Sequence, residues 1–350
     1  MKSPEITIDG RAIGAEHPPY IIAELSRIHN GDLDRAKDLI AHAKEAGADA
    51  VKLQTYTPDT MTIDCDSELF RVKDGLWAGR NLYELYGQAQ TPWDWHQSLF
   101  ERGRELGITV FSTPFDSTAV EFLSSLNSPA FKIASFEATD VPLIRTIARA
   151  GKPIILSTGI ASLGEISDAV SAIREEGCES IVLLHCVSAY PAPAEDSNLR
   201  TIAHLGETFA AVPGLSDHTL GTSVSLAAIA LGACVIEKHV TLRRADGGPD
   251  AAFSLEPDEL RHLVTEARTV WQAVGRINYD RKASEDEMRV LRRSIFVVRD
   301  IKSGELLSDE NIRCIRPGYG LAPKYLPDVI GRRASRFVSR GTPLDWSMVG

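Results

Sequence analysis

The chain has 350 residues, 43% of them hydrophobic and 25% charged, a composition typical of folded globular proteins. Its net charge of -10 argues against nucleic acid as a partner, and no stretch approaches the roughly 20 apolar residues of a membrane helix. The start, MKSPEITIDG, lacks the basic and apolar regions of a secretory signal. We therefore expect a cytoplasmic protein with no membrane partner.

Short apolar runs recur every 20 to 30 residues and alternate with amphipathic stretches such as DRAKDLIAHAKEAGADA. There are eight of them: YIIAELS, AVKLQTY, TVFSTPF, AFKIASF, PIILSTG, IVLLHCVS, AVPGLSDH and VIEKHVT. Each run is apolar on both faces, as a buried parallel strand is. The pattern predicts an α/β fold, a (β/α)8 TIM barrel. The alternative is a doubly wound open sheet, but AELSRIHNGD after the first run lacks its glycine-rich turn.

Three segments depart from this rhythm. Residues 64–94 are rich in aromatics and predict an excursion at the barrel rim. Residues 276–291 are polar and predict a linker between a barrel domain, 1–275, and a small, mostly β domain, 292–350. This last domain holds eleven Lys and Arg against six Asp and Glu, interleaved with apolar runs. A nucleic-acid arm remains an alternative, but the interleaving favours a folded basic cap over an anionic ligand.

Polar residues end most of the apolar runs, where a barrel carries its catalytic groups. Lys52 and Lys132 stand inside runs that should be fully buried, and a buried cation is costly unless it is paired or functional. We expect both lysines to bind an anion at the barrel mouth. The hydroxyls of Ser135, Ser157 and Ser216 would complete a phosphate cradle.

Two histidines, His218 and His239, end the last two predicted strands. Imidazoles at adjacent strand ends can reach one divalent ion and leave positions open for water and a substrate oxygen. The alternative is that each histidine only forms hydrogen bonds within the barrel. The residues alone leave both interpretations open.

At these positions the sequence resembles the sialic acid synthase family, and its pseudaminic acid synthase branch in particular. The family-like stretches cover almost the whole chain: IIAE, HNG, KLQTYTPDTMT, TPFD, FKIASFE, LSTG, GLSDHT, VIEKH, RADGGPDAAFSLEP, RRSIFV and IRPGYGL. NLYELYGQAQTPWDWH and ADGGPDAAFSLEP point to the pseudaminic branch rather than to the N-acetylneuraminate or legionaminate synthases. The C-terminal domain resembles the antifreeze-like (SAF) domain of such enzymes.

The resemblance implies a transferase that condenses phosphoenolpyruvate with 2,4-diacetamido-2,4,6-trideoxy-L-altrose and water, giving pseudaminic acid and phosphate. It implies a divalent cofactor, Mn²⁺ first and Mg²⁺ or Co²⁺ otherwise, on His218 and His239. The expected phosphoenolpyruvate ligands are Lys52, Gln54, Lys132, Ser135, Ser157, Ser188 and Ser216. The expected sugar ligands are Glu24, Glu137, Tyr190, Asp250 and, from the partner subunit of a domain-swapped homodimer, Arg316. Glu24, Lys132, His218 and His239 are the expected catalytic residues, with Glu24 handling protons.

One motif departs from the family. Ile28 precedes HNG where the family usually has asparagine, and the bulky Arg27 stands next to it. Both positions bear on which sugar is accepted. Three other functions remain open: an N-acetylneuraminate or legionaminate synthase with the same mechanism, a Schiff-base aldolase using Lys132, and a sugar-binding protein without activity.

Overall fold

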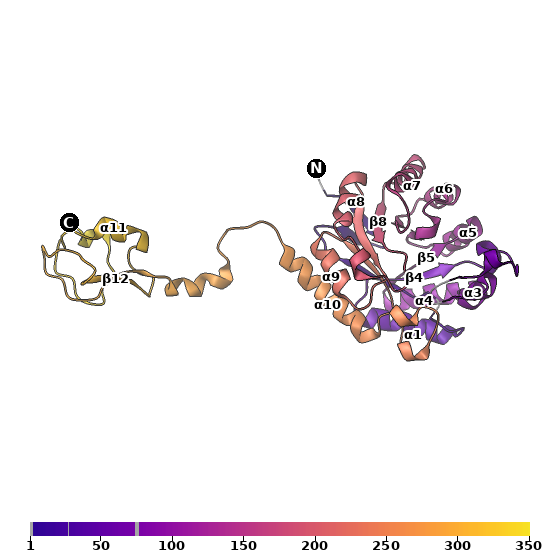
Figure 1. Ribbon diagram of the computed structural model, residues 1–350, viewed down its shortest axis with the longest axis horizontal. Coiled ribbons are helices and arrows are strands. Elements are labelled where there is room, and N and C mark those ends of the chain that lie inside the picture. The colour runs from indigo at the N-terminus through magenta and orange to yellow at the C-terminus, as the bar shows by residue number, and fades with distance from the viewer. Residues whose placement is uncertain (1–2, 27, 74–76) are drawn as a thin grey trace. The chain divides into compact units, whose positions relative to one another are not determined.

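The computed structural model describes residues 3–26, 28–73 and 77–350, and the chain divides into two compact units, Met1–Gly275 and Arg276–Gly350 (Figure 1). In the first unit eight parallel strands form a closed barrel in the order β10-β3-β4-β5-β6-β7-β8-β9. The strands are β3 (Tyr20–Glu24), β4 (Ala50–Thr55), β5 (Thr109–Pro114), β6 (Phe131–Ile133), β7 (Ile154–Ser157), β8 (Ile181–Cys186), β9 (Val212–Asp217) and β10 (Val235–His239). Each lies within one of the eight apolar runs, so the predicted TIM barrel is confirmed.

Helices surround the barrel (Figure 1). They are α1 (Leu33–Ala46), α3 (Leu82–Ala89), α4 (His96–Leu106), α5 (Ser117–Ser125), α6 (Val141–Arg149), α7 (Leu163–Glu175), α8 (Thr201–Phe209), α9 (Ser223–Ala230) and α10 (Pro257–Val274), with a single turn α2 (Pro58–Met61). Their ends follow local sequence: α1 begins where the Asp32 carboxylate accepts hydrogen bonds from Asp34 N and Arg35 N. It ends at Gly47, whose φ of 91° favours glycine.

The strand residues alternate between two environments. Those facing the helices, such as Val51 and Ile236, pack into the large outer core, and those facing inward, such as Ala50 and Val235, form a second apolar cluster. Toward the carboxyl ends of the strands the inward positions become polar, as at Lys52. The barrel interior therefore has an apolar lower layer and a polar upper layer.

A hairpin that the sequence analysis did not predict closes the lower end of the barrel. β1 (Glu5–Ile8) and β2 (Arg11–Gly14) pair antiparallel with Ile6 opposite Ile13. The buried isoleucines of this hairpin belong to the same apolar cluster as Tyr20 and Phe111 inside the barrel. The interior is thus sealed at its amino end.

The aromatic segment 64–94 folds into α3 and two short 3-10 turns, Glu68–Phe70 and Trp93–Trp95. Trp93 Nε1 donates to the Tyr56 carbonyl at 3.2 Å, and Asn81 Nδ2 donates to the Cys65 carbonyl at 3.0 Å. The first bond fastens the excursion to the chain that leaves β4, and the second joins two parts of the excursion itself.

The second unit has its own apolar core around Ile295, Ile301 and Leu344. β11 (Ser294–Val297) and β12 (Ile312–Ile315) pair antiparallel, and isolated bridges such as Ala334 with Val349 extend the β structure around one short helix, α11 (Leu326–Val329). The expected small, mostly β domain is confirmed. Across the described parts of both units, no helix is long and apolar enough to cross a membrane.

Candidate active site

A cavity of about 400 Å³ lies at the carboxyl ends of the barrel strands. All the predicted site residues except Glu24 and Arg316 line it: Lys52, Gln54, Lys132, Ser135, Glu137, Ser157, Ser188, Tyr190, Ser216, His218, His239 and Asp250. These residues come from strands β4, β6, β7, β9 and β10 and from the loops that follow the strands. Only closure of the barrel brings them together.

Lys52 lies between two buried carboxylates at the base of the cavity. Its Nζ is 3.0 Å from Glu24 Oε2 and 2.9 Å from Glu237 Oε1, and all three residues are at most 4% exposed. Gln54 Nε2 also donates to Glu24 Oε1, at 3.1 Å. Burial would lower the pKa of Lys52, but Glu237 and Glu24 raise it above its ordinary value, so this ammonium stays charged.

The other buried lysine has a different environment. Lys132 Nζ donates to Ser157 Oγ at 2.7 Å and to the Ile133 carbonyl at 3.0 Å, while Glu237 Oε1 is 4.0 Å away. Burial lowers the pKa of Lys132 to about 8; Glu237 opposes this shift and Lys52 adds to it. Lys132 therefore titrates close to neutral pH, and a bound anion would favour its charged form.

Three glutamates in or next to the cavity, Glu24, Glu137 and Glu237, differ in the direction of their pKa shifts. Burial raises the pKa of Glu24 even though Lys52 opposes the shift, whereas Lys132 and Lys52 outweigh burial and lower the pKa of Glu237. Burial also raises the pKa of Glu137, to about 7. At neutral pH the Glu137 carboxyl can therefore both donate and accept a proton.

Small polar side chains crowd around Gly159, directly after β7. Gly159 N donates to Ser135 Oγ at 3.1 Å, and a Cβ added to Gly159 would lie 2.2 Å from Ser188 Oγ and 3.2 Å from Cys186 Sγ. The hydroxyls of Ser135 and Ser188 and the ammonium of Lys132 line one side of the cavity. Hydroxyls next to an ammonium suit the oxygens of a phosphate or carboxylate.

His218 and His239 face each other across the ends of neighbouring strands, with ring centroids 5.3 Å apart. His218 Nδ1 is 2.9 Å from the Val187 carbonyl, which fixes Nδ1 as the protonated nitrogen and turns Nε2 away from it. His239 Nδ1 lies 3.3 Å from Ser26 Oγ and 3.7 Å from Asp250 Oδ2.

Such partners on Nδ1 are typical of metal-bound histidines. Within the described residues no group of three or more His, Cys, Asp or Glu has the arrangement of a metal site. The residues present fit a divalent ion held by two imidazoles, with its other positions open to water and substrate.

Asp250 and Tyr190 flank this pair. Asp250 is 3% exposed and accepts a hydrogen bond from Ser26 Oγ at 3.0 Å, and the Tyr190 ring lies 4.3 Å from the His218 ring. Tyr190 also packs against Trp77, whose Nε1 donates to the Pro249 carbonyl. The loops after β8 and β10 and the aromatic excursion thus meet beside the histidines.

The remaining predicted positions lie elsewhere. Glu24 is fully buried and reaches the cavity through Lys52 and Gln54. Arg316 follows β12 in the second unit, where its side chain is exposed. Ile28 is buried in the outer core between strands and helices, not in the cavity, because an apolar side chain at this point packs with the barrel helices. Arg27 lies outside the described residues.

Sequence reasoning missed several residues that line the cavity. Glu237 and Cys186 were not among the predicted site residues, although Glu237 joins both lysines. Strand alternation could have found them, because Glu237 lies two residues before His239 and therefore faces the same side. The apolar side chains of the excursion were also missed, because the stretch NLYELYGQAQTPWDWH, which holds Leu82 and Leu85, points to a branch of the family and not to a position in the cavity.

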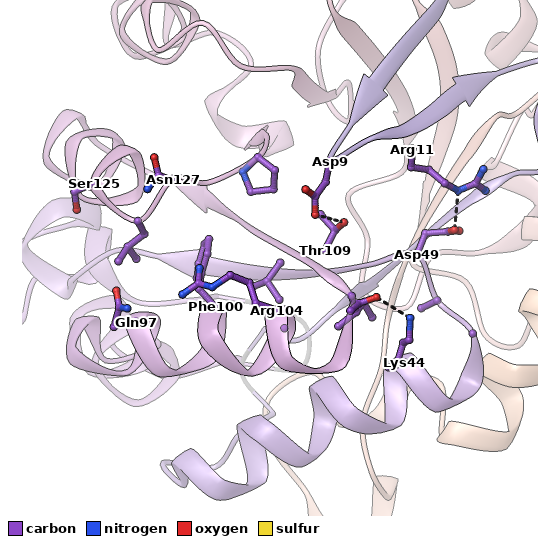
Figure 2. A pocket seen from close by; sticks show the side chains of 18 of the residues that line it. Asp9, Arg11, Lys44, Asp49, Gln97, Phe100, Arg104, Thr109, Ser125 and Asn127 are labelled. Carbon is purple, nitrogen blue, oxygen red and sulfur yellow. Dashed lines mark hydrogen bonds and ion pairs between the residues drawn. The ribbon is translucent and has the colours of Figure 1, made fainter.

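A larger hollow of about 1100 Å³ lies at the opposite end of the barrel (Figure 2). Three pairs of its polar groups bond to one another: Arg11 Nε to Asp49 Oδ1 at 3.0 Å, Thr109 Oγ1 to Asp9 Oδ2 at 3.1 Å, and Lys44 Nζ to the Gly107 carbonyl at 2.7 Å. Barrel enzymes carry their chemistry at the carboxyl ends of the strands. We therefore assign this hollow to structure rather than catalysis.

Comparison with known proteins gives the family of the chain. The NeuB family model matches residues 39–279 and the SAF domain model matches residues 292–350. A pseudaminic acid synthase from Helicobacter pylori is 46% identical over 331 residues, covering 93% of this chain and 96% of that one. An N,N'-diacetyllegionaminic acid synthase from Legionella pneumophila is 37% identical over 343 residues, covering 96% of each.

A solved structure extends the similarity to three dimensions. The N-acetylneuraminic acid synthetase of Leptospira borgpetersenii, crystallised with citrate, superposes with a TM-score of 0.74 at 35% identity. The match covers 82% of this chain and 95% of that one. The chain therefore belongs to the NeuB family of sialic acid synthases and ends in a SAF domain.

Proposed function

We propose that this protein is a pseudaminic acid synthase, a transferase that joins phosphoenolpyruvate to 2,4-diacetamido-2,4,6-trideoxy-L-altrose. The observation that carries the proposal is one cavity holding two buried lysines, a cluster of serines and a pair of histidines. The branch is supported by 46% identity to a pseudaminic acid synthase, against 37% to a legionaminic acid synthase.

In this proposal the anionic substrate lies on the polar upper layer. Lys52, Lys132 and Gln54, with the hydroxyls of Ser135, Ser157, Ser188 and Ser216, would hold the carboxylate and phosphate of phosphoenolpyruvate. The lysines would also stabilise the charge that develops on the leaving phosphate. The sugar would lie against Glu137, Tyr190 and Asp250, with Glu24 reaching it through Gln54.

The reaction forms one carbon–carbon bond and one carbon–oxygen bond from water, and it breaks the carbon–oxygen bond that joins C2 to phosphate. C3 of phosphoenolpyruvate attacks the aldehyde carbon, water adds at C2, and phosphate leaves with its bridging oxygen. A divalent ion, Mn²⁺ in our proposal, would supply Lewis acidity toward the aldehyde oxygen from His218 and His239. Glu137, with its pKa near 7, joins Glu24 as a candidate for moving protons at the sugar oxygen and the water.

The test is phosphate release from phosphoenolpyruvate with Mn²⁺ and one of three sugars: the L-altro sugar, the legionaminate precursor, or N-acetylmannosamine. We expect release with the L-altro sugar alone and its loss with EDTA. Preference for another sugar would assign the protein to another branch of the family. Absence of phosphate release with all three sugars would overturn the synthase assignment.

A Schiff-base aldolase is the second candidate, because a lysine with a pKa of about 8 has a substantial neutral fraction and can act as a nucleophile. Borohydride reduction in the presence of pyruvate separates the two. Labelling of Lys132 together with EDTA-resistant activity would favour the aldolase, and the synthase predicts neither.

We also propose a domain-swapped homodimer in which the partner subunit's Arg316 reaches the sugar. The support is the exposed Arg316 and the basic composition of the second unit. Mixing inactive His218→Gln protein with inactive Arg316→Ala protein tests it. Recovery of up to about a quarter of wild-type activity after subunit exchange is expected, since random pairing gives half heterodimers with one intact site each. No recovery despite exchange would exclude sharing of the site.

A further inference from the structure

One wall of the cavity is mostly apolar, although Trp77 and Tyr86 of the same segment also line the cavity. This apolar wall consists of side chains from the end of α2, the aromatic excursion, and the loops after β5 and β6: Met61, Val72, Leu82, Leu85, Phe115 and Phe136. The other parts of the lining are dominated by lysine, serine, histidine and carboxylate groups. The cavity is therefore divided into a polar side and an apolar side.

Barrel order places part of the apolar wall opposite the histidines. Going round the closed barrel, β5 is four strands from β9 and β6 is four strands from β10. Phe115 directly follows β5, Phe136 lies in the loop after β6, and His218 and His239 end or follow β9 and β10. Since four strands are half of an eight-stranded circle, Phe115 and Phe136 lie across the mouth from the histidine pair. The rest of the wall comes from the connection after β4, which is two strands from β10, and so continues from these two side chains round one side of the mouth.

The wall is braced from behind. Tyr56 is fully buried and its ring makes edge contacts with Phe115 at 5.3 Å and with Tyr86, on the same helix as Leu82 and Leu85, at 5.7 Å. Leu85 is only 2% exposed. A braced apolar surface cannot readily rearrange to offer a partner to a hydroxyl group.

We propose that the apolar wall selects aldehydes whose far end is deoxygenated, by receiving the C6 methyl group of the sugar. The inference rests on the proposed function: the aldehyde carbon must meet the enolpyruvate beside the histidines, so the open carbon chain extends from there across the mouth. The terminal carbon then meets the wall. A C6 hydroxyl placed against these six apolar side chains would lose its water and gain no hydrogen bond from them.

The experiment compares two sugars that differ in one oxygen, 2,4-diacetamido-2,4,6-trideoxy-L-altrose and its 6-hydroxy analogue, 2,4-diacetamido-2,4-dideoxy-L-altrose. Phosphate release at saturating phosphoenolpyruvate gives kcat/KM for each. Wild-type protein should prefer the 6-deoxy sugar by about 10- to 100-fold, the range that apolar pockets achieve against an added hydroxyl. Near-equal values would overturn the proposal.

Variants locate the effect. Met61→Gln and Leu82→Gln keep side-chain size but add a hydrogen-bonding amide, and each should lower the preference about 10-fold while leaving the KM for phosphoenolpyruvate unchanged. Met61→Leu should retain the preference. Leu69→Gln is the matched control, since Leu69 lies in the same excursion, is 83% exposed and is not part of the wall.

The experiment distinguishes failure of the proposed function from failure of the proposed role of the apolar wall. If wild-type protein turns over neither sugar, the proposed function fails. If it turns over the 6-deoxy sugar but folded Met61→Gln and Leu82→Gln, checked by thermal melting, keep the wild-type preference, the wall is not the selector. Equal effects of Leu69→Gln would also refute a role specific to the wall.

Discussion

Lys238 and Asp217 form a buried ion pair on the outer side of the barrel, and each immediately precedes one of the two histidines. Lys238 Nζ is 2.9 Å from Asp217 Oδ2, and the two residues are 1% and 3% exposed. Asp217 also accepts from Thr219 N at 2.8 Å and from Ser225 Oγ at 2.5 Å, while Lys238 donates to the Thr219 carbonyl at 2.6 Å. The pair fixes β9 against β10, where Asp217 is opposite Lys238 in the register.

The ion pair should therefore set the distance between the histidines. We expect Lys238→Met to weaken Mn²⁺ binding about 10- to 100-fold, as loss of a supporting contact to metal ligands does. Removing one partner of a buried pair also costs about 3–5 kcal/mol of stability. Mn²⁺ affinity is measured by electron paramagnetic resonance of the free ion.

Asp49→Asn is the control for this loss of stability, because the Arg11–Asp49 pair lies at the other end of the barrel. It should lower the melting temperature while leaving Mn²⁺ affinity unchanged. If Lys238→Met protein that remains folded binds Mn²⁺ as tightly as wild type, the ion pair does not position the histidines.

The histidines themselves should hold the metal. His218→Gln or His239→Gln should abolish measurable Mn²⁺ binding and reduce kcat by at least about 100-fold, because two protein ligands leave no reserve when one is lost. His204→Gln, an exposed residue on α8, is the matched control and should change neither quantity. Retained Mn²⁺ binding by both cavity variants would place the metal elsewhere.

The pKa of Lys132 predicts an alkaline limit to activity. A pKa lowered to about 8 means that the ammonium is charged below this pH and neutral above it, so the cavity loses a positive charge as pH rises. We expect kcat/KM for phosphoenolpyruvate, which reports the free protein, to fall tenfold per pH unit above about pH 8. The Lys132→Arg variant keeps its positive charge at alkaline pH, so its kcat/KM should not fall above about pH 8 even if its rate is lower. If kcat/KM of that variant falls above pH 8 as in wild type, the titration belongs to another group.

Gly159 tests the serine cluster. In Gly159→Ala the new Cβ would lie 2.2 Å from Ser188 Oγ and 2.8 Å from Ser135 Oγ, so at least one hydroxyl must move. A displacement of about 1 Å can cost about 100-fold in kcat/KM, and we expect a loss of this size for phosphoenolpyruvate. Gly164→Ala is the control, since its Cβ would meet only Ser162 Oγ at 3.9 Å. Equal kinetics of both variants would argue against anion binding at this cluster.

The sequence predicts the barrel well because each buried parallel strand is a short run apolar on both faces, a signal that does not depend on distant residues. The strand-end polar residues follow from the same runs. The hairpin of residues 5–14 is harder to predict, because ITIDGRAIG reads equally well as a surface loop until its isoleucines are seen against Tyr20 and Phe111.

The site could be predicted only in part. Lys52 and Lys132 stand out because a charge within an apolar run is unusual, but Glu237 follows an ordinary pair of apolar residues and gains its role from two lysines that are remote in sequence. Met61 and Leu82 look like core residues in the sequence. Their position on the wall depends on how the excursion folds back over the barrel, which local patterns do not encode.

The hairpin at the lower end of the barrel also determines the order in which substrates bind and products leave. Ile6, Ile8 and Ile13 seal that end, so in the part of the barrel that the structure describes the mouth is the route by which substrates enter and products leave. A ligand held on the lysines must arrive before the sugar covers it and depart after the sugar acid has gone. Phosphate should therefore be a competitive inhibitor with respect to phosphoenolpyruvate, whereas the sugar acid should not. Steady-state product-inhibition kinetics measure both patterns, and a different pattern would indicate a different order of binding and release.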